Sequence, residues 1–176
     1  MSTTETTEPT LHTGTWVVEP AHSEVGFTVR HLGLSKVRGR FNRFTPTAEI
    51  SDPTTASSVQ ASIDMSSVDT NNPDRDGHLQ SGDFFNAETS PQMTFVSTSV
   101  TEDTLVGELT INGVTKPVVL DAKLNQKGDH PMANKPWAGF DATTTVLRSD
   151  FNLGMFAPYI SDEVKIDISI EAMKAE

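Results

Sequence analysis

Five histidines are the residues best suited to metal chemistry, and their spacing argues against it. His12, His22, His31, His78 and His130 are scattered over the chain. They form no H-x-H or H-E-x-x-H motif and no pair at helical spacing, which are the patterns that bring two imidazoles to one ion. His22 and His31 stand nine residues apart across one predicted strand, so a regular strand places them on opposite faces. We therefore predict surface or hydrogen-bonded histidines and no metal site.

A group of carboxylates could instead supply a general acid and a general base in a cleft. The group comprises Asp74, Asp76, Asp83 and Glu88. The preceding Asn72-Pro73 is typical of a helix start, however, where acids stabilise the positive end of the helix dipole. We expect one short helix over residues 73–82, with these acids on a solvated face and Leu79 toward the core. The sequence also lacks a G-x-S-x-G elbow, a phosphate loop and a dinucleotide fingerprint, so it predicts no catalytic residue and no cofactor.

Composition narrows the range of partners. The 176 residues carry 13 Lys and Arg against 24 Asp and Glu, a formal net charge of −11. Nucleic acid and an anionic membrane surface are disfavoured, because both are bound through basic faces. The absence of cysteine excludes disulfides, thiolate metal sites and thiol catalysis. No apolar stretch is long enough to form a transmembrane segment, and the N-terminus lacks the basic and apolar segments of an export signal, so we expect a cytoplasmic protein.

Short segments of alternating polar and apolar residues must position any site, and this period of two is typical of antiparallel strands. The predicted strands are Thr15–Glu19, Glu24–His31, Lys36–Ile50, Ser57–Met65, Gln92–Val100, Thr104–Ile111, Val114–Gln126, Trp137–Leu147 and Glu163–Met173. The apolar parity changes within the third segment, which predicts a bulge or bend near Asn42–Arg43. Asn112-Gly113 predicts a tight hairpin that pairs Ile111 with Val114 and places Leu105 opposite Leu120.

Strand length indicates the architecture. Several strands have about ten residues, or roughly 30 Å, which is long for a small domain. We expect an all-β fold, an elongated antiparallel barrel of about eight strands, which can be filled by side chains or can hold one small ligand. It would occupy residues 13–174 as a single domain, after a disordered tail over residues 1–12. Gly39 and Gly107 on inward faces favour an incompletely filled interior. Arg148 and Asp150 are expected to pair at one barrel end, and Lys116 to lie on the rim.

Several motifs occur in a recognisable order along the chain. They are Trp16–Ser23, Val25–His31, Val37–Phe41, Arg75–Phe85, Pro91–Phe95, Gly107–Val118 and Arg148–Leu153. Together they resemble the YceI-like family of lipocalin-like, polyisoprenoid-binding proteins, over about residues 14–172. Gly14-Thr15-Trp16 is also similar to the G-x-W motif on the first strand of lipocalins.

The resemblance implies an extended eight-stranded lipocalin-like barrel, usually a homodimer, and relatives that are often exported. It implies a binding or carrier protein that holds a long-chain polyisoprenoid in its interior and performs no catalysis. The residues expected to contact such a ligand are Trp16, Phe27, Val29, His31, Phe41, Ile63, Leu79, Phe84, Phe95, Leu109, Phe140 and Phe151. Two alternatives stay open: an enzyme that acts on such a lipid through the carboxylates near the helix, and a structural or stress-related barrel whose core is simply filled.

Overall fold

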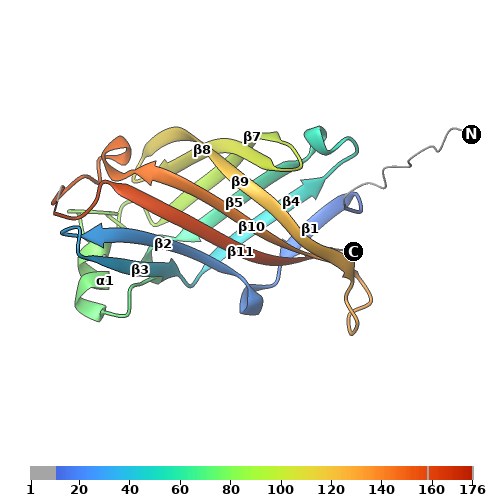
Figure 1. Ribbon diagram of the computed structural model, residues 1–176, viewed down its shortest axis with the longest axis horizontal. Coiled ribbons are helices and arrows are strands. Elements are labelled where there is room, and N and C mark those ends of the chain that lie inside the picture. The colour runs from blue at the N-terminus through green and yellow to red at the C-terminus, as the bar shows by residue number, and fades with distance from the viewer. Residues whose placement is uncertain (1–10, 158, 176) are drawn as a thin grey trace, which may run out of the picture.

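Eight antiparallel strands close into an elongated barrel, as the sequence predicts (Figure 1). The computed structural model describes residues 11–157 and 159–175, so the tail predicted over residues 1–12 lies almost entirely outside the described residues. In pairing order, the barrel strands are β1 (Gly14–Val18), β4 (Phe44–Ile50), β5 (Ser58–Asp64), β7 (Gln92–Val100), β8 (Thr104–Ile111), β9 (Val114–Asp129), β10 (Pro136–Leu147) and β11 (Glu163–Lys174). The barrel closes where the end of β11 pairs with β1, with Val18 opposite Ala172.

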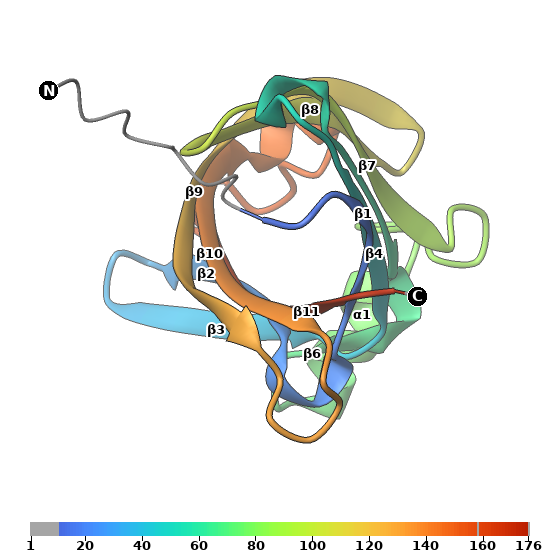
Figure 2. The ribbon, with the colours of Figure 1, turned by 90° about the vertical axis from the view of Figure 1, so that its right-hand side faces the viewer.

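Three further strands extend the sheet from the same edge of β11. They are β2 (Glu24–His31), β3 (Ser35–Phe41) and the two-residue β6 (Val68–Asp69). Residues 165–169 of β11 pair with β2, whereas residues 172–174 pair with β1. Because the same edge of β11 pairs with both β1 and β2, the β2–β3 hairpin leaves the barrel wall and projects outward, as the view along the barrel shows (Figure 2).

Two local predictions about chain direction are confirmed. The expected break at Asn42–Arg43 separates β3, which belongs to the projecting hairpin, from β4, which belongs to the barrel. Asn112 and Gly113 both adopt positive φ angles, of 50° and 76°, as a two-residue hairpin turn requires. The turn pairs Ile111 with Val114 and fixes the register of all of β8 against the first half of β9.

The single α-helix, α1 (Pro73–Gln80), begins where the sequence predicts. The Asn72 side chain caps it by accepting a hydrogen bond from the Arg75 amide at 3.1 Å. Leu79 packs against the core, so the helix covers one end of the barrel. Four single 3₁₀ turns complete the fold: η1 (Pro20–His22), η2 (Thr54–Ala56), η3 (Met65–Ser67) and η4 (Arg148–Phe151). Among the described residues, no helix is long and apolar enough to cross a membrane.

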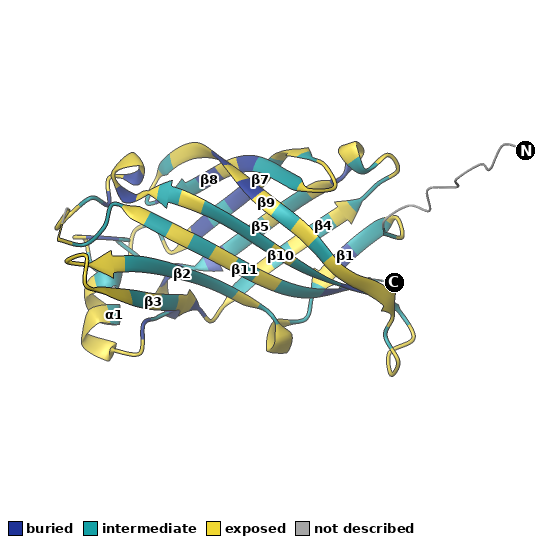
Figure 3. Cartoon of the chain, in the orientation of Figure 1, coloured by how far each residue is buried: buried dark blue, intermediate teal, exposed yellow. Residues whose placement is uncertain are grey.

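Half-buried and exposed residues alternate along much of β11, as its inward and outward faces require (Figure 3). Buried apolar side chains form two clusters. The larger one, here called the helix-end cluster, comprises Phe41, Ile63, Met65, Val68, Met93, Phe95, Leu109, Ile111, Val118, Leu120, Phe151 and Leu153. The smaller one, the β1-end cluster, comprises Trp16, Ala138 and Ala172. The two clusters lie toward opposite ends of the barrel, with half-buried apolar residues between their fully buried members. Of these, Ala142 and Ile168 pack against the helix-end cluster, and Phe140 and Ile170 against the β1-end cluster.

The two inward-facing glycines do not leave the empty space that the sequence suggests. A Cβ atom at Gly39 would come within 2.3 Å of the Phe27 ring, and one at Gly107 within 2.4 Å of the Phe95 ring. Each glycine therefore accommodates an aromatic ring from the neighbouring strand, which fills the space that a side chain would occupy. The expectation that these glycines indicate unfilled volume is wrong.

We predict that Gly107→Ala destabilises the protein by about 2 kcal/mol, because the added methyl group overpacks a buried site. The Cβ would meet the Phe95 ring and also the Val96 carbonyl oxygen, at 2.6 Å, and the backbone cannot rotate away as a flexible side chain could. Gly128→Ala is the matched control, since a Cβ there has no atom within 4 Å. Urea unfolding of both variants measures the difference, and equal midpoints would contradict the assignment.

Candidate ligand-binding interior and its surroundings

Between the two clusters, the inward-facing side chains are small or only half-buried. In register across three strands, Ala122 of β9 lies opposite Ala142 of β10, which lies opposite Ile168 of β11. Strand alternation directs all three into the barrel, yet none is fully buried. Ile166 and Ile170 share this inward face and are also half-buried. Apolar side chains that keep accessible surface inside a closed barrel indicate an interior that protein atoms do not fill to normal core density.

The structure divides the twelve predicted contact residues among several places. Those in the helix-end cluster are Phe41, Ile63, Phe95, Leu109 and Phe151, with Phe27 and Leu79 packed against it. Trp16 lies in the β1-end cluster, with Phe140 packed against it. The remaining three lie near α1 or on β2: Phe84 is buried beside the His78 ring, Val29 is half-buried, and His31 is exposed at the hairpin tip.

The residues best placed to line an open interior are ones that the sequence reasoning missed. Ala122, Ala142 and Ile168 face the interior and are only half-buried, with Ala142 and Ile168 at the edge of the helix-end cluster. The prediction favoured large aromatic side chains, which pack the two ends. A usable signal was present in the sequence. Small residues at inward positions in the middle of long strands leave room near the barrel axis, because neighbouring strands hold the walls at a fixed separation.

Arg148 organises the β10–β11 connection from inside the fold. Its guanidinium group donates hydrogen bonds to the carbonyl oxygens of Ser161, Leu153, Met155 and Ile160, at 2.7–2.9 Å. The side chain is buried, and burial lowers the pKa of Arg148. The predicted pairing with Asp150 is wrong, because the chain turns into η4 at Arg148 and strand alternation no longer applies.

Asp162 supports the same connection from the surface. Its carboxylate accepts hydrogen bonds from the Ser149 amide at 2.8 Å and the Ser149 hydroxyl at 2.5 Å. The hydrogen bond from the Ser149 hydroxyl lowers the pKa of Asp162 below its ordinary value. Arg148 and Asp162 therefore hold the segment between β10 and β11 against one end of the barrel.

One group of side chains has the composition of a metal site. Single ligand atoms of Glu19, His22 and Glu171 lie within 4.8 Å of one another, beside a hollow of about 380 Å³ that His130 and Trp137 also line. Glu19 caps η1 by accepting from the Ala21 and His22 amides, and its carboxylate hydrogen-bonds the His22 ring at 2.8 Å. Capping accounts for this arrangement without an ion.

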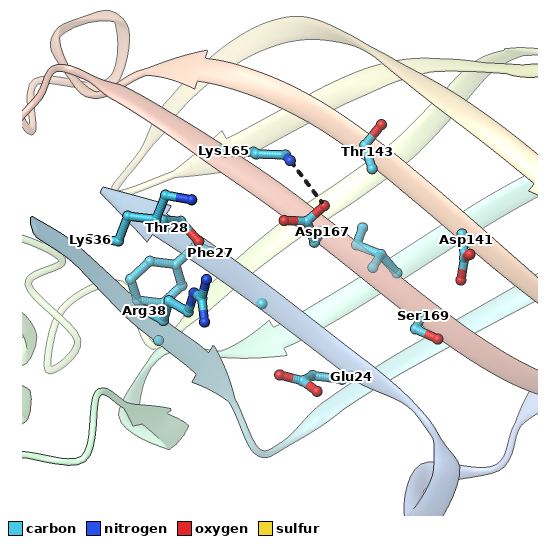
Figure 4. Close-up of a pocket in the computed structure, with 13 residues that line it drawn as sticks. Glu24, Phe27, Thr28, Lys36, Arg38, Asp141, Thr143, Lys165, Asp167 and Ser169 are labelled. Atoms are coloured by element: carbon cyan, nitrogen blue, oxygen red, sulfur yellow. Dashed lines mark ion pairs between the residues drawn. The ribbon is translucent and has the colours of Figure 1, made fainter. Parts of the chain in front are cut away.

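A second hollow lies outside the barrel wall and is charged. It has a volume of about 520 Å³ and follows the outer faces of β3, β2, β11 and β10 (Figure 4). Lys36 and Arg38 line one part, Glu24 and Asp141 line another, and Lys165 pairs with Asp167 at 3.9 Å. Its polar lining is unsuited to an apolar chain, so this groove is not the candidate lipid site.

Comparisons with known proteins agree with the architecture. A family model described as the YceI-like domain matches residues 16–172. Protein YceI of Escherichia coli is 42% identical over 161 residues, which cover 89% of this chain and 84% of that protein. The crystal structure of BcnA from Burkholderia cenocepacia has a TM-score of 0.78 at 26% identity, covering 88% and 98% of the two chains. A polyisoprenoid binding domain from Saccharophagus degradans has a TM-score of 0.66, covering 93% and 100%, and its 16% identity limits the likeness to the fold.

An elongated antiparallel barrel with small and half-buried apolar residues along its middle defines a lipocalin-like barrel. Within that class, the chain belongs to the YceI-like domain family, because the family model covers nearly all of the barrel. The family resemblance predicted from the sequence motifs is confirmed.

We predict that Arg148→Met lowers the free energy of unfolding by about 3 kcal/mol, because it leaves carbonyl groups without their charged donor. Arg38→Met is the control, since the Arg38 side chain is exposed and has no hydrogen-bond or ion-pair partner among the described residues. It should change stability by less than about 0.5 kcal/mol. Urea unfolding checks both values, and an equal loss in the two variants would refute a structural role for Arg148.

The Glu19–His22 contact predicts a pH dependence. The hydrogen bond that the His22 ring donates to the Glu19 carboxylate raises the pKa of His22. The contact therefore stabilises the protein below the ordinary histidine pKa of about 6.5, and this stabilisation is lost as pH rises through the raised pKa. The substitution Glu19→Gln should bring the pKa of His22 back toward the ordinary value, and NMR titration of the His22 ring measures this change. The stability difference from the unmodified protein should be larger at acidic than at alkaline pH. An unchanged pKa of His22 would show that the contact is not formed in solution.

Proposed function

We propose that this protein binds a long apolar lipid, a polyisoprenoid in particular, inside the barrel. The observation that carries the proposal is the row of Ala122, Ala142 and Ile168, which are apolar, face the barrel interior and are only half-buried. A long barrel with such an apolar inner face suits a chain-like ligand better than a compact one. The Saccharophagus degradans neighbour, described as a polyisoprenoid binding domain, supports this class of ligand for the shared fold.

The physical basis of such binding is burial of hydrocarbon. Each methylene group removed from water contributes about 0.8 kcal/mol, so affinity grows with the length of chain enclosed. Polar contacts would then select the headgroup at a barrel end, and few are needed. Long strands are therefore the feature that this function requires, and β9, β10 and β11 have 16, 12 and 12 residues.

The carboxylates around α1 give little support to the enzyme alternative. Asp76 accepts hydrogen bonds from the Thr70 amide and hydroxyl, at 2.9 Å and 2.5 Å, and so fixes the chain before the helix. His78 pairs with Asp83 at 3.0 Å on the surface, and Asp74 is exposed. These groups are engaged in local structure or face solvent, whereas catalysis on a lipid would need them to converge inside the barrel. We therefore favour binding or carriage over chemistry.

The homodimer expected from the family resemblance stays part of this proposal. Sedimentation analysis of the purified protein tests it directly, with the expected result of a species twice the mass of the 19.1 kDa chain. The lipid site proposed above lies within one barrel, so a monomeric result would leave the interior site intact and would remove only the dimer.

We predict that Ala142→Trp blocks lipid binding, because an indole ring at the middle of the interior occupies the space that the chain would enter. Native mass spectrometry after incubation with a polyprenyl lipid should show the lipid-bound fraction falling by about tenfold or more, which corresponds to only about 1.4 kcal/mol of lost binding free energy. The matched control is Thr145→Trp, on the same strand but facing outward and exposed.

Unfolding midpoints of the two tryptophan variants establish that each is folded before binding is compared. Equal retention of lipid by both variants, or no affinity of the unmodified protein for any prenyl lipid, would overturn the interior site. The second result would favour the alternative of a structural barrel with a filled core.

A further inference from the structure

Positive charge is concentrated on one hairpin of a strongly acidic protein. Five of the 13 Lys and Arg residues fall within residues 25–48, a segment without Asp or Glu, although the chain carries a net charge of −11. The five are Arg30, Lys36, Arg38, Arg40 and Arg43. This segment contains β2 without its first residue, all of β3 and most of β4, so the cations lie on and beside the hairpin that projects from the barrel wall.

Three of these cations have no side-chain partner in the part of the chain that the structure describes. Arg40 pairs with Asp69 at 3.8 Å and Arg43 with Asp64 at 2.9 Å. Among the described residues, no hydrogen bond or ion pair involves the side chains of Arg30, Lys36 or Arg38. Arg30 lies directly opposite Lys36 in the β2–β3 register, a like-charge pair that disfavours the hairpin in isolation. An anionic surface would relieve this repulsion.

The tip of the same hairpin is apolar and exposed. Leu32 and Leu34 have exposed fractions of 50% and 81%. The Leu32 amide donates to the Tyr159 carbonyl oxygen at 2.6 Å, which joins the tip to the β10–β11 connection. That connection adds Met155, Phe156 and Tyr159, exposed by 42%, 49% and 65%. Two segments far apart in sequence therefore place five large apolar side chains at one end of the barrel.

We propose that this rim docks on a lipid bilayer that contains anionic lipids. The rim is defined as Leu32, Leu34, Met155, Phe156 and Tyr159 together with the cations Arg30, Lys36 and Arg38. Leucine and aromatic side chains enter the interface between headgroups and acyl chains, while basic side chains behind them contact phosphate groups. The net negative charge of the remaining surface orients the molecule, because only this rim is attracted to the membrane. Docking goes beyond the proposed function, since it requires no ligand in the interior.

A bilayer fits this surface better than the other partners. A symmetric contact between two copies of the rim would bring the same unpaired cations close to one another. Nucleic acid would satisfy the cations, yet it offers no apolar phase for five exposed leucine, methionine and aromatic side chains. The overall acidity of the sequence predicts repulsion from anionic membranes, and the structure revises that expectation locally. Arg30 and Lys36 lie near the hairpin tip, whereas Glu24 lies at the far end of β2.

The test is co-sedimentation of the full chain with vesicles of phosphatidylcholine and phosphatidylglycerol, compared with vesicles of phosphatidylcholine alone. The unmodified protein should bind the anionic vesicles and lose affinity as salt is raised. Arg30→Gln, Lys36→Gln and Arg38→Gln combined should lower the partition coefficient by about 100-fold, as expected for three basic contacts. Leu32→Ser with Leu34→Ser should lower it by about tenfold or more, on the hydrocarbon transfer scale.

Matched controls lie away from the rim. Met132→Ser removes an apolar side chain that is 90% exposed on the β9–β10 turn, and Lys123→Gln removes an exposed cation of β9. Neither should change vesicle binding. Absence of binding to anionic vesicles, or equal loss in rim and control variants, would overturn the proposal. A lower molecular mass of the rim variants than of the unmodified protein, measured in solution without vesicles, would also overturn it. The rim would then be the contact between two copies of the chain. The vesicles contain no prenyl lipid, so failure here is distinguishable from failure of the interior site.

Discussion

The division of one strand edge is the constraint on which the rest of this structure depends. The final residues of β11 pair with β1 and close the barrel, while residues 165–169 of the same edge pair with β2. A backbone edge offers one row of donors and acceptors, so the two neighbours must occupy successive lengths of it. Closure at one end therefore forces the β2–β3 hairpin out of the wall at the other, which exposes the basic residues and the leucine tip.

The interior follows from the same closure. Large side chains pack the end covered by α1, and Trp16 with two alanines packs the other, while the inward-facing Ala122, Ala142 and Ile168 of the middle strands are only half-buried. A continuous core would be more stable, because close packing adds dispersion contacts throughout. Small residues at mid-strand inward positions are thus better explained by binding than by stability.

Much of the architecture could be predicted because its signals are local. The alternation of the strands, the Asn112-Gly113 turn and the cap at Asn72 each depend on residues within a few positions of one another. The site could not be predicted to the same extent. Aromatic side chains attracted attention as ligand contacts, yet Phe27 and Phe95 cover glycines on neighbouring strands, and only the pairing of β2 with β3 and of β7 with β8 reveals this.

The sequence by itself determined the all-β class, the hairpin registers and the family, since periodicity and motif order survive without coordinates. Only the tertiary structure decided which end each cluster fills, that Arg148 binds carbonyl groups and not Asp150, and that Leu32 meets the β10–β11 connection. The physical reason is that these contacts depend on the course of the chain beyond each strand: Arg148 reaches carbonyl groups 5 to 13 residues further along a turn, and Leu32 meets Tyr159 from a distant part of the sequence. Their partners are chosen by barrel closure and strand order, which local residue patterns do not encode.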